Sequence, residues 1–181
     1  MSVRGRIIAG KYRHRPLKVL FNDVTRSTKE RVKEAMFSAL GEAVIAANVL
    51  DLFAGSGALG IEAISRGAHH AFFYENSRET YEVLKQNCAF ISTETTIIYG
   101  DYKTKISHLE PRSIDVVFID PPYDIDPLTA INLLLSAQIL KAKFIIVVES
   151  EGKFPHTISN TKTTYYEYGR THVAIIRGGY E

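Results

Sequence analysis

The sequence predicts an α/β fold with a mostly parallel sheet, a C-terminal antiparallel hairpin and an N-terminal β-hairpin arm. Between residues 49 and 149, apolar strand-like runs alternate with helical patterns, which favours parallel strands joined by helices on both faces. Near the C-terminus, the runs 163–168 and 172–177 are separated by three residues, so they must pair antiparallel. A chain of 181 residues with 45% hydrophobic residues can form one substantial core.

The first 22 residues predict a basic arm. They contain six Lys or Arg and no Asp or Glu. Two apolar runs, 7–9 and 17–20, surround Gly10 and the basic stretch 12–16, which indicates a β-hairpin with a long or bulged turn. We therefore expect an arm over 1–22 and a main domain over 23–181. The basic arm suggests a polyanionic partner, although lysine and arginine also protect a solvated edge hairpin from aggregation.

The main domain is expected to begin with a helix. Ser27 or Thr28 can cap its first turn, and Gly41 can end it. The later elements follow from apolar periodicity and turn residues. We expect strands at 49–53, 71–75, 96–99, 114–120 and 144–149, and helices at 58–66, 78–90 and 128–135.

A glycine-rich turn follows the first strand of the main domain. Residues 55–60 match the pattern G-x-G-x-x-G, in which glycines let the backbone approach a ligand closely. This pattern also fits nicotinamide-dependent oxidoreductases, or a tight turn that packs a helix on a strand. Asp51 and Phe53 precede the glycines, and a carboxylate at Asp51 can hold a cationic methionine group, which a pyrophosphate site would disfavour. Asp51 could instead be a cap or turn residue.

Two further carboxylates fall at the ends of predicted strands, where open α/β sheets bind ligands. Glu75 can accept hydrogen bonds from both hydroxyls of a ribose, a role that suits a nicotinamide cofactor equally well. Asp101 can accept from an adenine amino group or cap a helix. With Asp51, Phe53, Gly55 and Gly57, these residues predict a site for S-adenosylmethionine.

The motif Asp120-Pro121-Pro122-Tyr123 follows a buried strand directly. Two prolines fix an extended backbone and remove two N–H donors, so that carbonyl groups stand without competing donors. The Asp120 carboxylate and the Pro121 carbonyl can then accept both protons of a nucleobase amino group, which turns the nitrogen lone pair toward a methyl donor. Tyr123 can stack on the base. The alternative is a simple loop after the strand.

Other residues exclude several classes of protein. The six histidines show no metal-binding spacing, so no metal is expected. Cys88 is the single cysteine, which rules out an intrachain disulfide, and it fits a buried thiol. No apolar run reaches the length of a membrane span. A cytoplasmic monomer is the simplest expectation.

The chain resembles the bacterial methyltransferases that modify guanine N2 in small-subunit (16S) ribosomal RNA. The matching segments are 6–10, Arg26-x-Thr28-x-x-Arg31-Val32-Lys33-Glu34, 51–63, 120–123 and 147–149. The chain departs from the family pattern in two places: Ser27 replaces a proline, and Asn76-Ser77 replace more charged residues. The resemblance implies a class I methyltransferase (Rossmann-like) fold and a target in ribosomal RNA or in an assembling 30S particle.

The resemblance also implies roles for individual residues. Arg26, Thr28 and Arg31 would border the cofactor and target-base pocket, although they could equally form a solvated first turn. RNA would contact the arm and the first helix through Arg4, Arg6, Lys11, Tyr12, Arg13, Arg15, Lys18 and Arg31. The choice of guanine rests on the resemblance alone, because adenine also offers an exocyclic amino group. An adenine-N6 methyltransferase of DNA or RNA, and a non-catalytic RNA-binding protein, remain the alternatives.

Overall fold

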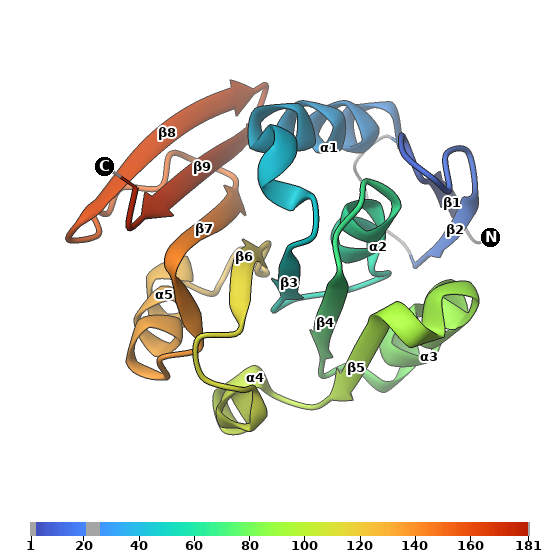
Figure 1. The fold of residues 1–181 in the computed structure, drawn as a ribbon. Helices are drawn as coiled ribbons and strands as arrows, with labels where there is room; N and C mark the ends of the chain where they lie inside the picture. Colours follow the sequence, from blue (N-terminus) through green and yellow to red (C-terminus); the bar gives the residue numbers. More distant parts are fainter. Residues whose placement is uncertain (1–2, 21–25, 181) are drawn as a thin grey trace.

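The computed structural model of the chain describes residues 3–20 and 26–180, and at residues 3, 4 and 26–28 it describes the backbone alone. In this described part, the main sheet has seven strands in the order β5-β4-β3-β6-β7-β9-β8 (Figure 1). Strands β3 to β7 are parallel, and β9 runs antiparallel between β7 and β8. The predicted mostly parallel sheet with a C-terminal antiparallel hairpin is confirmed.

The elements lie close to their predicted positions. The strands are β1 (Val3–Arg6), β2 (Pro16–Val19), β3 (Asn48–Asp51), β4 (His70–Glu75), β5 (Thr95–Tyr99), β6 (Ile114–Ile119), β7 (Leu140–Ser150), β8 (Thr161–Tyr168) and β9 (Thr171–Gly178). The α-helices are α1 (Arg26–Leu40), α2 (Ala58–Ser65), α3 (Arg78–Cys88), α4 (Tyr102–Lys105) and α5 (Pro127–Ser136). The short helix α4 was not predicted, because four residues cannot show helical periodicity. Among the described residues, no helix is long and apolar enough to cross a membrane.

Helices cover both faces of the sheet. Side chains alternate between the two faces along each strand, so each strand contributes to two separate cores. One core joins the sheet to α1, α2 and α3 through residues such as Phe37, Ile64 and Leu84. The other joins it to α4 and α5 through residues such as Tyr102 and Ile131. This layering fixes which strand-end side chains face which helices.

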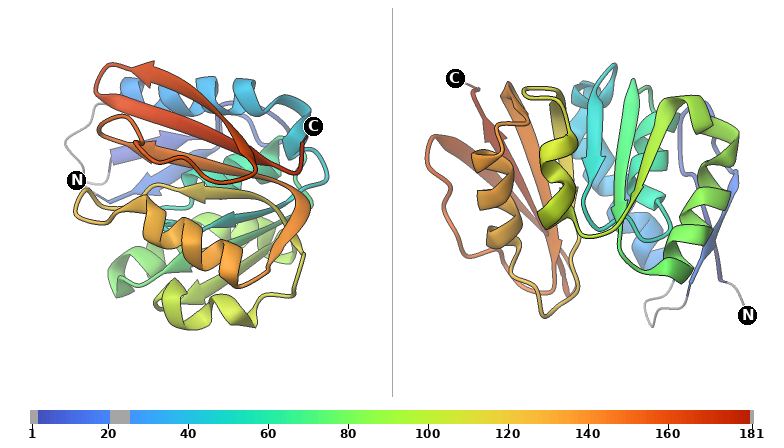
Figure 2. Two further views of the ribbon diagram at one scale, coloured as in Figure 1. Left: turned by 90° about the vertical axis from the view of Figure 1, so that its left-hand side faces the viewer. Right: turned by 90° about the horizontal axis from the view of Figure 1, so that it is seen from below.

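The N-terminal hairpin forms a separate sheet of β1 and β2, packed beside α1 and α2 (Figure 1). It lies at the opposite end of the molecule from β8, as Figure 1 and the right-hand view of Figure 2 show. The predicted N-terminal β-hairpin is confirmed, but its first strand is β1, which ends at Arg6, and the apolar run 7–9 lies beyond it. The N–H groups of Ile8 and Ala9 donate to the Glu62 carboxylate at 2.9 and 3.1 Å instead of forming a strand ladder. The proposed arm boundary at residue 22 lies outside the described residues.

Candidate functional site

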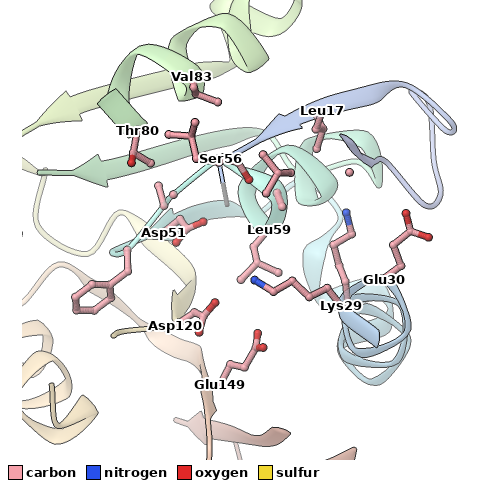
Figure 3. A pocket seen from close by; sticks show the side chains of 18 of the residues that line it. Leu17, Lys29, Glu30, Asp51, Ser56, Leu59, Thr80, Val83, Asp120 and Glu149 are labelled. Carbon is pink, nitrogen blue, oxygen red and sulfur yellow. The ribbon is translucent and has the colours of Figure 1, made fainter. Parts of the chain in front are cut away.

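Three carboxylates lie in a row at the carboxyl ends of neighbouring strands. Asp51 pairs in register with Phe118, and Ile119 pairs with Val148. Asp120, which directly follows β6, and Glu149 of β7 are therefore neighbours one position further along. Because side chains alternate, all three carboxylates project on the face that packs against α1. Figure 3 shows Asp51, Asp120 and Glu149 pointing into one pocket.

Two adjoining cavities form a cleft over these strand ends. The first, of about 330 Å³, is walled by the hairpin, the start of α1 and the glycine-rich loop. The second, of about 470 Å³, lies between the ends of β4 and β5 and the loop after β6. They share four lining residues, Phe53, Gly55, Thr80 and Asp120. Asp120 thus stands where the two cavities meet, in reach of a ligand in either one.

Asp51 is a buried carboxylate that lacks a well-formed hydrogen bond within the described part of the chain. It is 1% exposed, and neither oxygen has a hydrogen-bond partner among the described residues. Desolvation, and then the negative charges of Asp120 and Glu75, raise the pKa of Asp51 to about 8, and the nearby backbone N–H groups of Phe53 and Gly60 offset only part of this rise. Buried polar groups normally have partners, and leaving one unsatisfied is costly. An ionised Asp51 is therefore suited to a cationic group bound in the first cavity.

Asp120 and Glu149 have raised pKa values as well. The Asp120 side chain is open to the cleft, yet the surrounding protein limits its hydration and raises its pKa to about 6. Desolvation and the charge of Asp120 raise the pKa of Glu149 to about 8. Lys29, on the first turns of α1, opposes both shifts. Its side chain reaches from α1 toward the two carboxylates (Figure 3).

The loop after β6 keeps the Asp-Pro-Pro-Tyr motif accessible. Asp120, Pro121 and Pro122 line the second cavity. A hydrogen bond of 3.0 Å from the Ile125 N–H to the Pro122 carbonyl closes the turn. Tyr123 is 96% exposed, so its ring is free to meet a partner. Its stacking on a base stays a prediction.

The glycine-rich loop is held by contacts from β4 and α3. Gly57 has a φ of 88°, and a β-carbon there would lie 2.6 Å from Cδ1 of Leu84. The Gly55 N–H donates to the Glu75 carboxylate at 2.8 Å. Asn87 donates its side-chain amide to the Ser56 carbonyl at 2.8 Å. The loop therefore presents a fixed backbone to both cavities.

The second cavity contains the other two predicted cofactor carboxylates. Glu75 lines it and also accepts the N–H of Ser77 at 2.9 Å. Asp101 also lines this cavity, and its carboxylate caps α4 by accepting the N–H of Lys103 at 2.9 Å. The helix cap that the sequence offered as an alternative role is therefore present. Tyr102, which the sequence did not single out, lines the same cavity. Its hydroxyl is buried without a partner among the described residues.

The start of α1 contributes residues that the sequence did not identify. Lys29 and Lys33 line the first cavity together with Glu30. Arg31 is exposed and is not among the lining residues. The side chains of Arg4, Arg26 and Thr28 lie outside the described part of the chain, so their predicted contacts stay predictions.

The basic residues of the hairpin differ in how tightly they are held. Lys11 and Arg13 are exposed on the turn, where the Lys11 ammonium contacts only the neighbouring Tyr12 ring among the described residues, 4.9 Å from its centre. Three other basic side chains have partners on neighbouring helices: Arg6 binds Glu30 of α1 at 3.1 Å, and Lys18 binds Gln86 of α3 at 2.6 Å. The Arg15 guanidinium lies 3.7 Å from the centre of the Phe90 ring, just after α3. The Tyr12 ring meets the same Phe90 ring edge-on, with their centres 4.9 Å apart. The turn is thus the part of the hairpin most open to a polyanion.

Residues 5–177 match the protein family described as conserved hypothetical protein 95. The chain belongs to this family. A Bacillus subtilis relative, "Putative rRNA methyltransferase YlbH", is 34% identical over 180 residues, which cover 95% of this chain and 98% of the relative. Ribosomal RNA small subunit methyltransferase D of Haemophilus influenzae is 37% identical over 83% of this chain and 80% of its own length.

A solved structure of a relative has the same fold as this chain. "Putative methyltransferase yhhF from Escherichia coli" superposes with a TM-score of 0.85 at 31% identity, covering 99% of this chain and all of the other. The predicted class I methyltransferase (Rossmann-like) fold is confirmed, and so is membership among the bacterial small-subunit ribosomal RNA methyltransferases. In this family context, the cleft described above is the candidate active site.

Proposed function

We propose that this protein transfers a methyl group from S-adenosylmethionine to the exocyclic N2 amino group of a guanine in small-subunit ribosomal RNA. The main observation behind this proposal is that Asp120 lies where the two cavities meet. The second cavity is suited to a nucleoside, and the first is reached from the basic hairpin. The family relatives named as small-subunit ribosomal RNA methyltransferases support the class of reaction and the RNA target.

The donor set of the cleft fits S-adenosylmethionine. The unpartnered Asp51 carboxylate suits a methionine moiety, which carries a cationic amino group. Glu75 and Asp101 offer acceptors for the ribose hydroxyls and the adenine amino group in the second cavity. Phe53 and Tyr102, whose ring centres lie 5.2 Å apart, add apolar surface for the nucleoside. When bound, S-adenosylmethionine supplies an electrophilic methyl group on a positively charged sulfur.

The protein contributes alignment and hydrogen-bond acceptors. The Asp120 carboxylate and the Pro121 carbonyl accept the two protons of the target amino group, which directs its nitrogen lone pair toward the methyl carbon. After transfer, the nitrogen has one proton too many, and Asp120 is placed to accept it. Tyr123 covers the base from solvent. Positioning and electrostatic stabilisation of this kind account for the rate without a covalent intermediate.

The hairpin is the proposed RNA-binding surface. Lys11 and Arg13 on its turn, with Arg15 and Lys18 nearby, offer positive charge to phosphate groups. Because β1 and β2 also wall the first cavity, RNA held on the hairpin has a route to Asp120. We propose that residues 1–22 act as this RNA-binding arm, that the transfer domain follows, and that the protein acts as a monomer.

A methyl-transfer assay tests the proposal. Small subunits from cells that lack this protein are incubated with it and with methyl-tritiated S-adenosylmethionine, and their RNA is digested to nucleosides. We expect label in N2-methylguanosine. Label in N6-methyladenosine would keep the mechanism and overturn the choice of base, whereas no label despite cofactor binding would contradict the proposed reaction.

A further inference from the structure

Glu149 occupies the position next to Asp120 on the side away from the cofactor carboxylate. The strand order β3-β6-β7 places Asp51, Asp120 and Glu149 in sequence across the sheet. Asp120 and Glu149 both line the first cavity, whereas Glu149 does not line the second. A base whose amino group is bound at Asp120 from the first cavity therefore presents its adjoining edge to Glu149.

Guanine and adenine differ at that edge. In guanine, the ring nitrogen N1 next to the N2 amino group carries a hydrogen and is a donor. In adenine, the ring nitrogen N1 next to the N6 amino group has a lone pair and is an acceptor. Proteins that bind an unpaired base hydrogen-bond this Watson–Crick edge. Whether Glu149, the group beside Asp120, donates or accepts a hydrogen bond therefore decides which of the two bases fits the site.

We propose, resting on the function proposed above, that Glu149 selects guanine by accepting the hydrogen bond of its N1–H while Asp120 holds the N2 amino group. Two neighbouring carboxylates would then bind the two neighbouring donors of one base. Adenine in the same place would bring a lone pair against the Glu149 carboxylate and leave that carboxylate unpaired in a desolvated site, which a specific site penalises strongly.

Lys29 is the positioning residue for this contact. It lines the first cavity from the opposite wall and points toward Asp120 and Glu149 (Figure 3). Its positive charge lowers the pKa of both carboxyls against the effect of desolvation. An ionised Glu149 can only accept a hydrogen bond, which suits guanine N1–H. The pKa of Glu149 stays near 8 in the ligand-free cleft even with Lys29 present, so the carboxylate form needed for guanine is favoured at and above that pH. A protonated Glu149 could donate to adenine N1, so the preference for guanine should rise with pH, and the comparison below is made above pH 8.

The test compares guanine with 2-aminopurine, which keeps the 2-amino group but has a lone pair at N1. Small-subunit RNA is prepared with either base at the nucleotide that takes the methyl label, and kcat/KM is measured for each. We expect the wild-type protein to prefer guanine by on the order of 100-fold, the usual worth of a hydrogen bond to a charged group. Equal rates on both RNAs would overturn the proposal.

Variants separate recognition from folding. Glu149→Gln offers an amide that can donate to the N1 of 2-aminopurine or accept from guanine, so we expect its preference to fall below ~10-fold. Glu151→Gln, an exposed change two residues away, should keep the wild-type preference. Binding of S-adenosylhomocysteine by calorimetry reports whether each variant is folded.

The two proposals fail in different ways. A Glu149→Gln protein that binds S-adenosylhomocysteine but keeps the wild-type base preference would overturn the role of Glu149 and leave the methyl-transfer function standing. If Glu149→Gln does not fold, equal wild-type rates on the two RNAs would still overturn the role of Glu149. A wild-type protein that binds S-adenosylhomocysteine but methylates neither RNA would overturn the proposed function, and this inference with it.

Discussion

The carboxylate of Glu62 on α2 accepts a hydrogen bond of 2.9 Å from the N–H of Ile8, which lies two residues beyond the end of β1 in the hairpin. Glu62 is fully buried, and it also forms ion pairs with Lys33 of α1 at 3.2 Å and with Arg66 at 2.9 Å. Lys33 in turn donates to the Arg6 carbonyl at 2.9 Å. One carboxylate therefore joins the hairpin, α1 and α2, and the first two of these wall the first cavity.

Removal of Glu62 should destabilise the whole domain. Glu62→Ala leaves the buried Lys33 without its ion pair and frees two hairpin N–H groups, which is expected to cost about 3–5 kcal/mol of unfolding free energy. Glu82→Ala is the matched control, because Glu82 also pairs with an Arg four residues away, but on the surface. Its cost should stay below ~1 kcal/mol. Urea unfolding measures both, and equal costs would contradict the proposed role of Glu62.

The stability of the ligand-free protein should fall as the pH rises from 5 to 8. Asp51 has a pKa of about 8 in the folded protein and an ordinary value near 3.8 when unfolded. Between these values the folded state holds the extra proton, so each such carboxyl lowers stability by up to ~1.4 kcal/mol per pH unit as the pH rises. Asp51→Asn cannot ionise and should show a shallower decline in Tm.

The same variant tests cofactor binding. Because the neutral amide introduced by Asp51→Asn cannot pair with a cationic methionine group, S-adenosylhomocysteine should raise the Tm of the wild-type protein but not that of the variant. Thermal melts with and without the ligand at pH 8 measure this difference. Equal ligand-induced shifts in the two proteins would show that Asp51 does not bind the cofactor.

The turn of the hairpin should contribute RNA affinity through charge. Lys11→Ala and Arg13→Ala each remove one exposed cation, so each should weaken binding and reduce the slope of log K against log salt by ~1. Lys162→Ala, on β8 at the far end of the molecule, is the control and should leave both unchanged (Figure 1). Filter binding of small-subunit RNA at several salt concentrations measures the affinity and its salt dependence. If neither hairpin substitution changes the salt slope, the hairpin turn does not contact RNA phosphates.

Gly57 should tolerate no side chain. Gly57→Ala combines an unfavourable φ of 88° with a contact of 2.6 Å to Leu84, and we expect a loss of ~3 kcal/mol or more in unfolding free energy. Gly169→Ala has a φ of 62° but no atom within 4 Å of the new β-carbon, so its loss should be only ~1 kcal/mol. Urea unfolding compares the two. If Gly57→Ala loses no more unfolding free energy than Gly169→Ala, the glycine-rich loop is not rigidly held by Leu84.

The sequence predicts the main domain well because its signals are local. Apolar runs end at carboxylates, and the glycine and proline motifs follow them within a few residues. Asp51, Glu75 and Asp120 could be placed at strand ends for that reason, and the structure places all three on the cleft. Glu149 ends the fifth predicted strand of this domain in the same way, so the same rule could have identified it.

The remaining features depend on tertiary contacts. The strand predicted at 7–9 fails because Glu62, which lies 54 residues beyond Ile8, binds its backbone. Lys29 reaches the carboxylates only because α1 packs across the carboxyl ends of β6 and β7. Tyr102 lines the cavity from a four-residue helix with no periodic signal. No pattern within a short stretch of sequence reports such distant pairings.

The most direct test of the central claim is the single-turnover rate of methyl transfer by Asp120→Ala, with RNA and cofactor both saturating. If Asp120 holds the target amino group at the junction of the two cavities, its loss should lower the rate by at least ~100-fold. RNA affinity and S-adenosylhomocysteine affinity should stay close to wild type, and Asp124→Ala, an exposed change in the same loop, should keep the full rate. An Asp120→Ala rate within about threefold of wild type would contradict the assignment of this cleft as the methyl-transfer site.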